Sequence, residues 1–279
     1  MKSKCYIKQK TMKRTDVQLF MLCNRNVPYL IDNDTVTPLQ CGTDVVDNNV
    51  CPLKDNTGDN ISYLNEFYLE NTGVYWIWKN VKNAKYKGQT QYRRQFKNLE
   101  YYDYDKIFQK YDIIVAEPLN LPTKFNHQDC TLSFHYKVAH NERDLNIMEE
   151  IIKTKYPEYA EDYDKYIKNG TDILYSCGFI MPSDKYDAYC EMLFNVLEEF
   201  RSRLNLNTIN DVKNYVLQCY ENSEYPDWTL NDDVTFEWKV KYQMRIGGSL
   251  AERFFTLYVF HNFKNIFYLP YDIKEDIKI

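Results

Sequence analysis

Two adjacent arginines, Arg93 and Arg94, follow a short extended run that begins at Tyr86 and leads through Gln91 and Tyr92. A guanidinium group binds phosphate oxygens through paired, charge-assisted hydrogen bonds, so two of them can neutralise a diphosphate directly. Chemistry at such a diphosphate would need no divalent cation. The residue types at this point therefore predict a site that can bind an anion such as a diphosphate.

A polar loop, Asp55–Ser62, precedes the arginines in the chain and is dense in carboxylates and amides. Side chains of this kind bind the hydroxyl groups of a sugar or a ribose by accepting paired hydrogen bonds. The loop's Asp55, Asn56, Asp59 and Asn60 are therefore candidate ligands for such hydroxyl groups.

An aromatic segment, Glu70–Asn80, lies between the polar loop and the arginines. Tyr75, Trp76 and Trp78 fall within four residues of one another, and Lys79 follows them. Aromatic rings at this spacing suit core packing, and they equally suit stacking on a nucleotide base or a sugar face. The spacing leaves both interpretations open.

The three segments resemble, in order and spacing, a family of bacterial glycosyltransferases of capsule and lipopolysaccharide biosynthesis, long described as a domain of unknown function. Its best-understood type is the galactofuranosyltransferase domain of bifunctional O-antigen galactan polymerases. The family pattern reads D-N-x-G-D-N-I-S, then E-x-T-G-x-Y-W-x-W-K-N, then G-x-x-H-Y-R-R, and it is matched by Asp55–Ser62, Glu70–Asn80 and Gly88–Arg94. Gln91 departs from the pattern, because it stands where the family has a titratable histidine.

Further matches lie on both sides of these segments. Asn24 and Arg25 follow the apolar run Val17–Cys23, which is typical of a buried parallel strand, and ligands bind at the carboxyl ends of such strands. The two residues are similar only in character to a T-H-K-like triplet of the family. His140 and Asp144 match a His-x-x-x-Asp-Leu element, where capping of the following helix is the alternative to a ligand role.

The segment from Gln243 to Arg253 matches the family pattern Q-x-R-x-x-G-[FY]-L-[SA]-E-R, with Arg245 as its first arginine and Ser249 in place of the aromatic residue. Glu252 and Arg253 close the motif. They are either a capping pair at the start of a helix or the floor of an active site. We favour the active site, because an inverting transfer needs a carboxylate base.

Strand-like and helix-like segments alternate in the first half of the chain, as in an α/β nucleotide-binding sheet. The resemblance implies an α/β protein of the GT-A-like glycosyltransferase fold, with a mixed central sheet flanked by helices and a helical C-terminal half. Apolar periodicity predicts a long helix from Ser183 to about Asn205, a strand over Ile173–Met181, and two helical pieces over Ser62–Asn80 broken at Thr72-Gly73. We expect one glycosyltransferase domain over 16–279, with a nucleotide-sugar half of about 16–130 and an acceptor half of about 131–279.

Composition and charge limit the kinds of binding partner and the cellular compartment that we expect for this protein. A net charge of −5 argues against nucleic-acid binding, because phosphate contacts need a basic face. The eight cysteines are scattered without a C-x-x-C pair, and the sequence shows no signal peptide or membrane-length apolar run, so we expect reduced thiols and a cytoplasmic protein. Residues 1–15 carry six basic and no acidic side chains, which predicts a flexible terminus or a peripheral contact with the inner face of the membrane.

The resemblance implies transfer of galactofuranose from a UDP-sugar to a hydroxyl of a glycan or a lipid-linked saccharide, with inversion and without a metal ion or another cofactor. Glu252 is the expected catalytic base, with Asp144 or Asp59 as a substitute. The side chains expected to bind the donor are Asn24, Arg25, Asp55, Asn56, Asp59, Asn60, Lys79, Gln91, Tyr92, Arg93, Arg94, His140, Arg245 and Arg253.

Two alternatives remain open at this point. One is a metal-dependent GT-A transferase that uses another nucleotide-sugar and holds Mn²⁺ or Mg²⁺ through Asp103 and Asp105, although these acids also suit a helix cap before Ile107. The other is a non-catalytic carbohydrate-binding relative that keeps the donor pocket.

Overall fold

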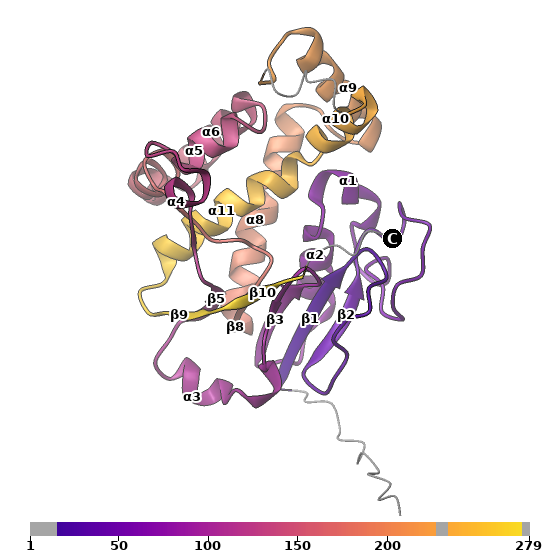
Figure 1. Cartoon of the computed structure of the whole chain (residues 1–279), viewed down its shortest axis with the longest axis vertical. Helices are drawn as coiled ribbons and strands as arrows, with labels where there is room; N and C mark the ends of the chain where they lie inside the picture. The colour runs from indigo at the N-terminus through magenta and orange to yellow at the C-terminus, as the bar shows by residue number, and fades with distance from the viewer. Residues whose placement is uncertain (1–15, 227–233, 275–279) are drawn as a thin grey trace, which may run out of the picture.

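The computed structural model describes residues 16–226 and 234–274. The stretch 1–15, for which we expect a flexible terminus or a membrane contact, lies outside the described residues. A central mixed sheet occupies one end of the molecule, and most of the helices come from the chain after residue 130 (Figure 1). This arrangement confirms the predicted α/β class and the helical C-terminal half.

Parallel pairing around β1 organises the sheet. The strands of the main sheet are β1 (Val17–Cys23), β2 (Val36–Gln40), β3 (Tyr86–Gln91), β4 (Arg94–Phe96), β5 (Ile113–Ala116), β8 (Phe179–Pro182), β9 (Ile266–Leu269) and β10 (Tyr271–Ile273), and β6 (Leu119–Asn120) pairs separately with β7 (Asp172–Ile173). β1 runs parallel to β2 and β3, whereas β8 runs antiparallel between β3 and β5. The carboxyl ends of β1, β2 and β3 therefore meet at one edge of the sheet.

Strand β1 is buried on both faces, as its continuous apolar run predicts. Phe20 and Leu22 belong to the larger hydrophobic cluster, which contains the helices packed on one face. Leu19 and Met21 belong to a smaller cluster on the other face. The alternation follows the two-residue period of a strand, and it makes β1 the centre of a layered core.

A tight reversal after β3 places the paired arginines at the sheet edge. β3 ends at Gln91, and β4 begins three residues later at Arg94, which pairs with Gln91 across the reversal. The Thr90 hydroxyl donates to the Arg94 carbonyl at 2.9 Å. The turn residue Tyr92 is tied to the neighbouring strand, because its amide donates to the Leu22 carbonyl at 3.1 Å.

Helices cover the sheet and form the rest of the molecule (Figure 1). They are α1 (Asn65–Tyr68), α2 (Asn71–Asn80), α3 (Tyr104–Phe108), α4 (Leu121–Phe125), α5 (Leu132–Lys137), α6 (Glu142–Lys155), α7 (Ala160–Asp162), α8 (Ser183–Arg203), α9 (Ile209–Glu221), α10 (Phe236–Gln243) and α11 (Ile246–Asn262). Shorter 3₁₀ and π turns occupy Ser62–Leu64, Leu99–Tyr101, Pro157–Tyr159 and Tyr163–Lys168. Among the residues that the structure describes, no helix has the length and apolar content to cross a membrane.

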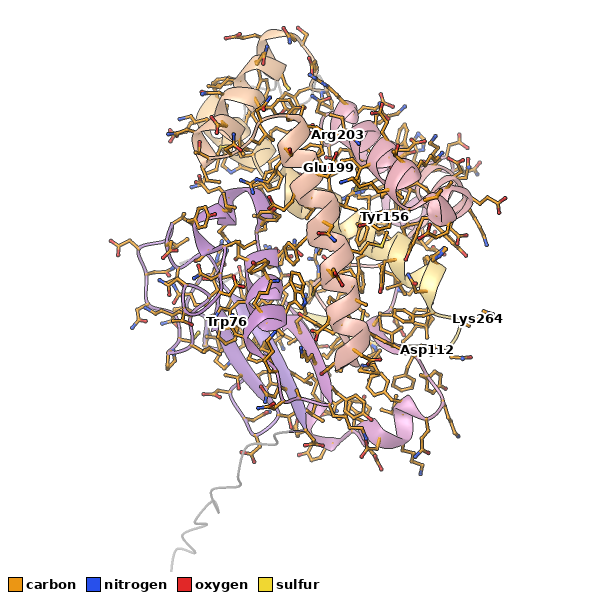
Figure 2. All side chains as sticks on the ribbon, turned by 180° about the vertical axis from the view of Figure 1, so that it is seen from behind. Trp76, Asp112, Tyr156, Glu199, Arg203 and Lys264 are labelled. Carbon is orange, nitrogen blue, oxygen red and sulfur yellow. The ribbon has the colours of Figure 1, made fainter. Side chains whose placement is uncertain are left out.

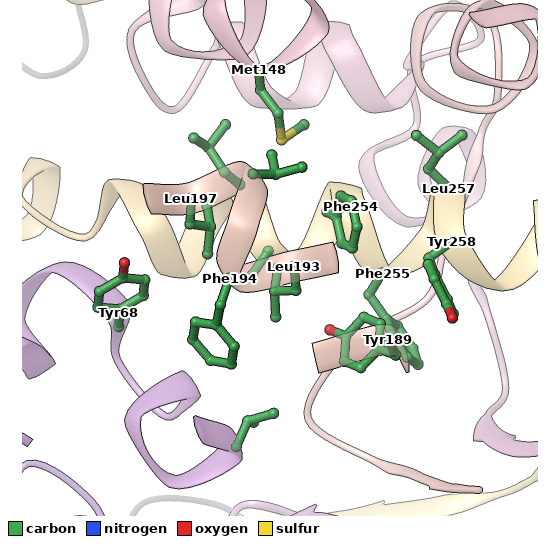
Figure 3. Packing of buried hydrophobic residues seen from close by; sticks show 14 of the residues in the cluster. Tyr68, Met148, Tyr189, Leu193, Phe194, Leu197, Phe254, Phe255, Leu257 and Tyr258 are labelled. Carbon is green, nitrogen blue, oxygen red and sulfur yellow. The ribbon is translucent and has the colours of Figure 1, made fainter. Parts of the chain in front are cut away.

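The long helix α8 begins at Ser183, as its sequence predicts, and links the sheet to the other helices. Tyr189 of α8 packs against Phe254 and Phe255 of α11, with ring centroids 6.2 and 5.5 Å away (Figure 3). Near the far end of α8, Glu199 binds Arg203 at 2.9 Å and Lys155 of α6 at 2.6 Å; Figure 2 labels Glu199 and Arg203 on this helix. The ring contacts hold α11 against α8, and the ion pair with Lys155 holds α6 against the far end of α8.

The break between the helical pieces α1 and α2 differs from the prediction. It falls at Leu69, not at Thr72-Gly73, because Leu69 adopts a left-handed φ of 54° that ends α1. Gly73 lies inside α2 and permits close packing instead. A Cβ at Gly73 would lie 2.5 Å from the sulfur of Cys41, which is tighter than packed atoms allow.

The prediction of a single strand over Ile173–Met181 is also wrong. The structure has two short strands there, β7 and β8, with a turn between them. The hydroxyl of Thr256 on α11 accepts from the Leu174 amide at 3.0 Å and lies 3.3 Å from its carbonyl. The backbone polar groups of Leu174 thus have a side-chain partner in place of a neighbouring strand. The turn that results carries Tyr175 toward the end of the sheet.

Candidate active site

A cavity of about 640 Å³ lies at the sheet edge where β1, β2 and β3 end. One wall is formed by residues after the strand ends, including Asn24 and Arg94. The opposite wall is formed by the helical half and includes His135, Trp238 and Glu252. Ligands of open α/β sheets bind at the carboxyl ends of the strands, so this cavity is the candidate active site.

Ten of the residues predicted from sequence line this cavity, although they come from four separate segments of the chain. They are Asn24, Arg25, Gln91, Tyr92, Arg93, Arg94, His140, Arg245, Glu252 and Arg253. The fold therefore brings the end of β1, the β3–β4 turn, the start of α6 and the first half of α11 to one place.

The remaining candidate residues do not line the cavity. Asn56 donates to the Asp44 carboxylate at 2.9 Å, and the Asn60 side chain donates to the Gly58 carbonyl at 3.0 Å. Asp59 accepts from the Tyr75 hydroxyl at 3.1 Å. The bond to Tyr75 holds the polar loop against α2, and the other two stabilise the loop itself and its contact with Asp44, so these side chains have structural roles.

Lys79 and Asp55 likewise have structural partners outside the cavity. The ammonium group of Lys79 lies 3.5 Å from the centre of the Trp78 ring, as in a cation–π contact. Asp55 is fully buried and accepts hydrogen bonds from neighbouring backbone and hydroxyl groups. Trp78 itself stacks on Phe194 of α8, with centroids 5.8 Å apart, so core packing accounts for this ring.

Positive charge dominates the cavity. Six basic side chains line it, against two carboxylates, Glu70 and Glu252; the basic ones are Arg25, Arg93, Arg94, Lys241, Arg245 and Arg253. The guanidinium of Arg94 also lies 4.4 Å from the ring centre of Tyr175, which fixes its plane. An anion with several oxygens, such as a diphosphate, is the ligand class that this lining favours.

Glu252 lies in the second turn of α11, because the helix begins at Ile246. The predicted capping pair is therefore excluded, and the side chain lines the cavity with 27% of its surface exposed. Burial raises the pKa of Glu252. The positive charge of Arg253 lowers this pKa, and the negative charge of Glu70 raises it. A carboxylate with a raised pKa accepts a proton more readily, which suits a general base.

Arg253 anchors the wall on which Glu252 lies. Its side chain is 2% exposed, and its guanidinium donates to Glu252 at 3.0 Å and to Nδ1 of His135 at 2.8 Å. Burial, together with the charge of Arg253, lowers the pKa of His135 to about 4. His135 is therefore neutral near pH 7 and can accept this hydrogen bond.

A column of stacked rings forms the helical side of the cavity. Trp238 stacks on Tyr242 with centroids 5.2 Å apart, and Tyr242 stacks on His140 at 5.5 Å. Gln243 donates to the Ala139 carbonyl at 2.9 Å, which turns its own carbonyl oxygen toward Nδ1 of His140 at 3.1 Å. Burial is the main cause that lowers the pKa of His140 to about 3, so this ring is neutral as well.

Gln91, which stands in place of the family's histidine, is 7% exposed and lies 3.5 Å from a guanidinium nitrogen of Arg94. An amide at this point keeps a hydrogen-bond acceptor beside Arg94 but removes a group that could titrate.

Asp144 lies in the core and away from the cavity. It is 1% exposed, in the first turn of α6, and it accepts from the Tyr215 hydroxyl of α9 at 2.6 Å. Burial raises the pKa of Asp144 to about 7, and the bond from Tyr215 opposes this rise. Asp144 is not among the described residues that line the candidate active site.

Among the described residues, no group of three or more His, Cys, Asp or Glu side chains is placed to hold a metal ion. Asp103 caps α3 by accepting from the Lys106 amide at 3.1 Å, and Asp105 binds Lys85 and the Tyr86 hydroxyl. Both acids lie outside the cavity lining.

Sequence reasoning missed several cavity residues: Asn65, Glu70, His135, Tyr175, Trp238 and Lys241. Glu70 carried a signal, since it is the first residue of the second motif. No local pattern marks His135, Tyr175 or Trp238. His135 lies on α5, Trp238 lies on α10 and Tyr175 lies in the turn between β7 and β8, and the packing of these elements brings them to the cavity.

Comparison with known proteins agrees with this architecture. Residues 18–219 match a family described as "Domain of unknown function (DUF4422)". Among solved structures, the apo structure of the bifunctional glycosyltransferase WbbM is similar to this chain with a TM-score of 0.69 and 21% sequence identity. The likeness covers 94% of this chain and 46% of that one, so this chain spans less than half the length of WbbM.

The similarity to WbbM at this level of identity concerns the fold, and it confirms the predicted glycosyltransferase-like architecture. No curated protein matches the chain.

The burial of Asp144 predicts an unusual dependence of stability on pH. An acid whose pKa is raised in the folded state binds a proton that the unfolded chain has released, so it lowers stability as pH rises from about 4 to 7. The variant Asp144→Asn keeps the contact with Tyr215 but cannot ionise. Its free energy of unfolding should rise relative to that of the unmodified protein by on the order of a few kcal/mol over this range.

Urea unfolding at a series of pH values measures this difference. Asp129→Asn serves as the control, since Asp129 is an exposed acid. Equal pH profiles for Asp144→Asn and the unmodified protein would contradict the structural assignment of Asp144.

Proposed function

The chain belongs to the family described as a domain of unknown function (DUF4422), and on this premise we propose that it is an inverting glycosyltransferase. It transfers galactofuranose from a UDP-sugar to a hydroxyl group of a glycan or a lipid-linked saccharide, without a divalent cation. The observation that carries the proposal is the placement of Glu252 in an arginine-lined cavity at the carboxyl edge of the sheet.

The donor's diphosphate binds to the guanidinium groups of Arg93, Arg94 and Arg245. All three line the cavity, and Arg94 is oriented by its contact with Tyr175. Forked guanidinium donors match phosphate oxygens in pairs, so they can stabilise the charge that a metal ion would otherwise neutralise. Asn24 and Arg25 follow β1 and line the cavity, and in this proposal they bind the nucleoside, because ligands of open α/β sheets bind beyond the carboxyl ends of the strands.

The transfer step is a single displacement. Glu252 accepts the proton of the acceptor hydroxyl as its oxygen forms a bond to the anomeric carbon of the sugar. The bond between this carbon and the phosphate oxygen breaks, and its electron pair leaves with UDP. The arginines stabilise the charge that develops on the departing diphosphate. Arg253 orients Glu252 through their 3.0 Å contact.

The acceptor binds on the helical side, against the exposed ring of Trp238. This indole is 48% exposed, lines the cavity, and is supported from behind by Tyr242. A rigid aromatic face next to a cavity offers apolar area at small entropic cost, which suits the C–H face of a sugar ring. A cytoplasmic location and a membrane contact through residues 1–15 stay predictions.

The base assignment predicts a kinetic defect in Glu252→Gln. The amide cannot accept the acceptor's proton, so kcat should fall by about 10²- to 10⁴-fold, while the affinity for UDP stays within about twofold. UDP release from UDP-galactofuranose in the presence of synthetic alkyl galactosides measures kcat, and calorimetry measures UDP affinity.

Glu237→Gln is the matched control, because Glu237 is exposed on α10 and does not line the cavity. Unchanged turnover in Glu252→Gln would refute its role as base. Absence of UDP release by the unmodified protein with both furanose and pyranose donors would contradict the proposed activity itself.

The acceptor platform predicts a different defect in Trp238→Ala. Loss of the stacking face should raise the acceptor KM by about tenfold, corresponding to about 1.4 kcal/mol, with the donor KM unchanged. Phe236→Ala is the control, since Phe236 is 54% exposed on the same helix but lies outside the cavity. Equal acceptor KM values for the two variants would remove Trp238 from the acceptor site.

A further inference from the structure

Asp55, which does not line the cavity, is the centre of a buried hydrogen-bond network. Its carboxylate accepts from the backbone amides of Gly42 and Thr43 at 2.8 and 3.1 Å. It also accepts from the hydroxyls of Ser62 at 2.6 Å and Thr72 at 2.7 Å. The network ties the end of β2 to the first turn of α2.

Thr72 connects this hydrogen-bond network to the break between α1 and α2. Its hydroxyl has a single proton, and the 2.7 Å distance to Asp55 is shorter than the 3.1 Å to the Leu69 carbonyl, so the proton points to Asp55. The hydroxyl oxygen is then free to accept from the side-chain amide of Asn65 at 3.0 Å. The same amide donates to the Leu69 carbonyl at 2.6 Å.

The network holds Leu69 in a conformation that a bulky residue rarely adopts, with φ 54° and ψ −135°. Such a backbone persists only where the surroundings fix it, and it concentrates at functional sites. Its consequence here is a reversal that turns Leu69 and Glu70 into the cavity lining. Without the hydrogen bonds from Asn65 and Thr72, the chain at this point could relax and Glu70 would move.

The reversal packs directly against the helix that carries the catalytic base. A Cβ at Gly248 of α11 would lie 2.7 Å from a methyl carbon of Leu69, so the two segments are in close contact. Glu252 follows Gly248 by one helical turn. The charge of Glu70 also raises the pKa of Glu252, as expected for two carboxylates that share a cavity.

The carboxylate of Glu70 differs from that of Glu252, the other carboxylate of the cavity, in its hydrogen bonding. It is half-buried, and within 16–226 and 234–274 no protein group donates a hydrogen bond to its side chain. A carboxylate repels a diphosphate but accepts two hydrogen bonds from neighbouring hydroxyls. In a nucleotide-sugar, the part that is neutral and rich in hydroxyls is the transferred sugar.

We propose that Glu70 binds hydroxyl groups of the donor's sugar ring, and that the network of Asp55, Thr72 and Asn65 positions it. The inference rests on the proposed transferase function and deepens it. Glu70 lies at the start of α2, next to Cys41 after β2, and Glu252 lies on α11. The anomeric carbon is then held between the group that binds the donor sugar and the base that activates the acceptor.

The test compares ligands that differ only by the sugar. Glu70→Gln should bind UDP with an affinity within about twofold of the unmodified protein, and it should bind UDP-galactofuranose about tenfold more weakly, because the hydrogen bonds to a charged acceptor are lost. Calorimetry with both ligands on both proteins gives the ratio. An unchanged ratio in Glu70→Gln would overturn the assignment of Glu70.

A second pair of variants tests the positioning network. Thr72→Val removes the hydroxyl and should reproduce the selective loss of UDP-galactofuranose affinity, whereas Thr72→Ser retains the hydroxyl and should restore it. Wild-type selectivity in a folded Thr72→Val protein would overturn the positioning role. Failure of the unmodified protein to bind UDP would instead contradict the proposed function, and this inference with it, so the two failures are distinguishable.

Discussion

The parallel pairing of β1 with β2 and β3 is the constraint on which the rest of the structure depends. It brings three strand ends to one edge, and each end is followed by residues of the cavity. β1 can lie between β2 and β3 with both of its faces covered because it is apolar on both faces. The packing of α8 against α11 positions the opposite wall of the cavity. The hydrophobic core therefore determines the distance between Glu252 on α11 and the arginines that follow β3.

The charges of the cavity side chains depend on how deeply these side chains are buried as well as on their residue types. Arg253 is almost fully buried, and it is tolerated because Glu252 and a neutral His135 accept its hydrogen bonds. The remaining basic groups line the open space with few carboxylates to offset them. Fixed cationic donors in a partly dry cavity need little reorganisation when charge develops on a leaving group, and this is the physical argument for the proposed transfer without a metal ion.

Sequence reasoning succeeded where the signal is local. The apolar run of β1, the periodicity of α8 and the three motifs gave the fold class, and ten candidate residues meet in one cavity. It could not separate binding carboxylates from structural ones. Asp55 is satisfied by donors at Gly42 and Thr72, and Asp144 by Tyr215, and these partners are distant in the sequence. Glu70 begins the second motif, but the sequence does not show that the positive φ of Leu69 turns it into the cavity lining.

The central claim is that arginines, and no divalent cation, hold the nucleotide diphosphate in this cavity. A calorimetric titration with UDP, carried out once in EDTA and once with Mn²⁺, tests this claim most directly. A site built from arginines should give the same dissociation constant in both buffers. Binding that appears only with Mn²⁺ would contradict it and indicate a metal site, and absence of binding in both buffers would remove the UDP site altogether.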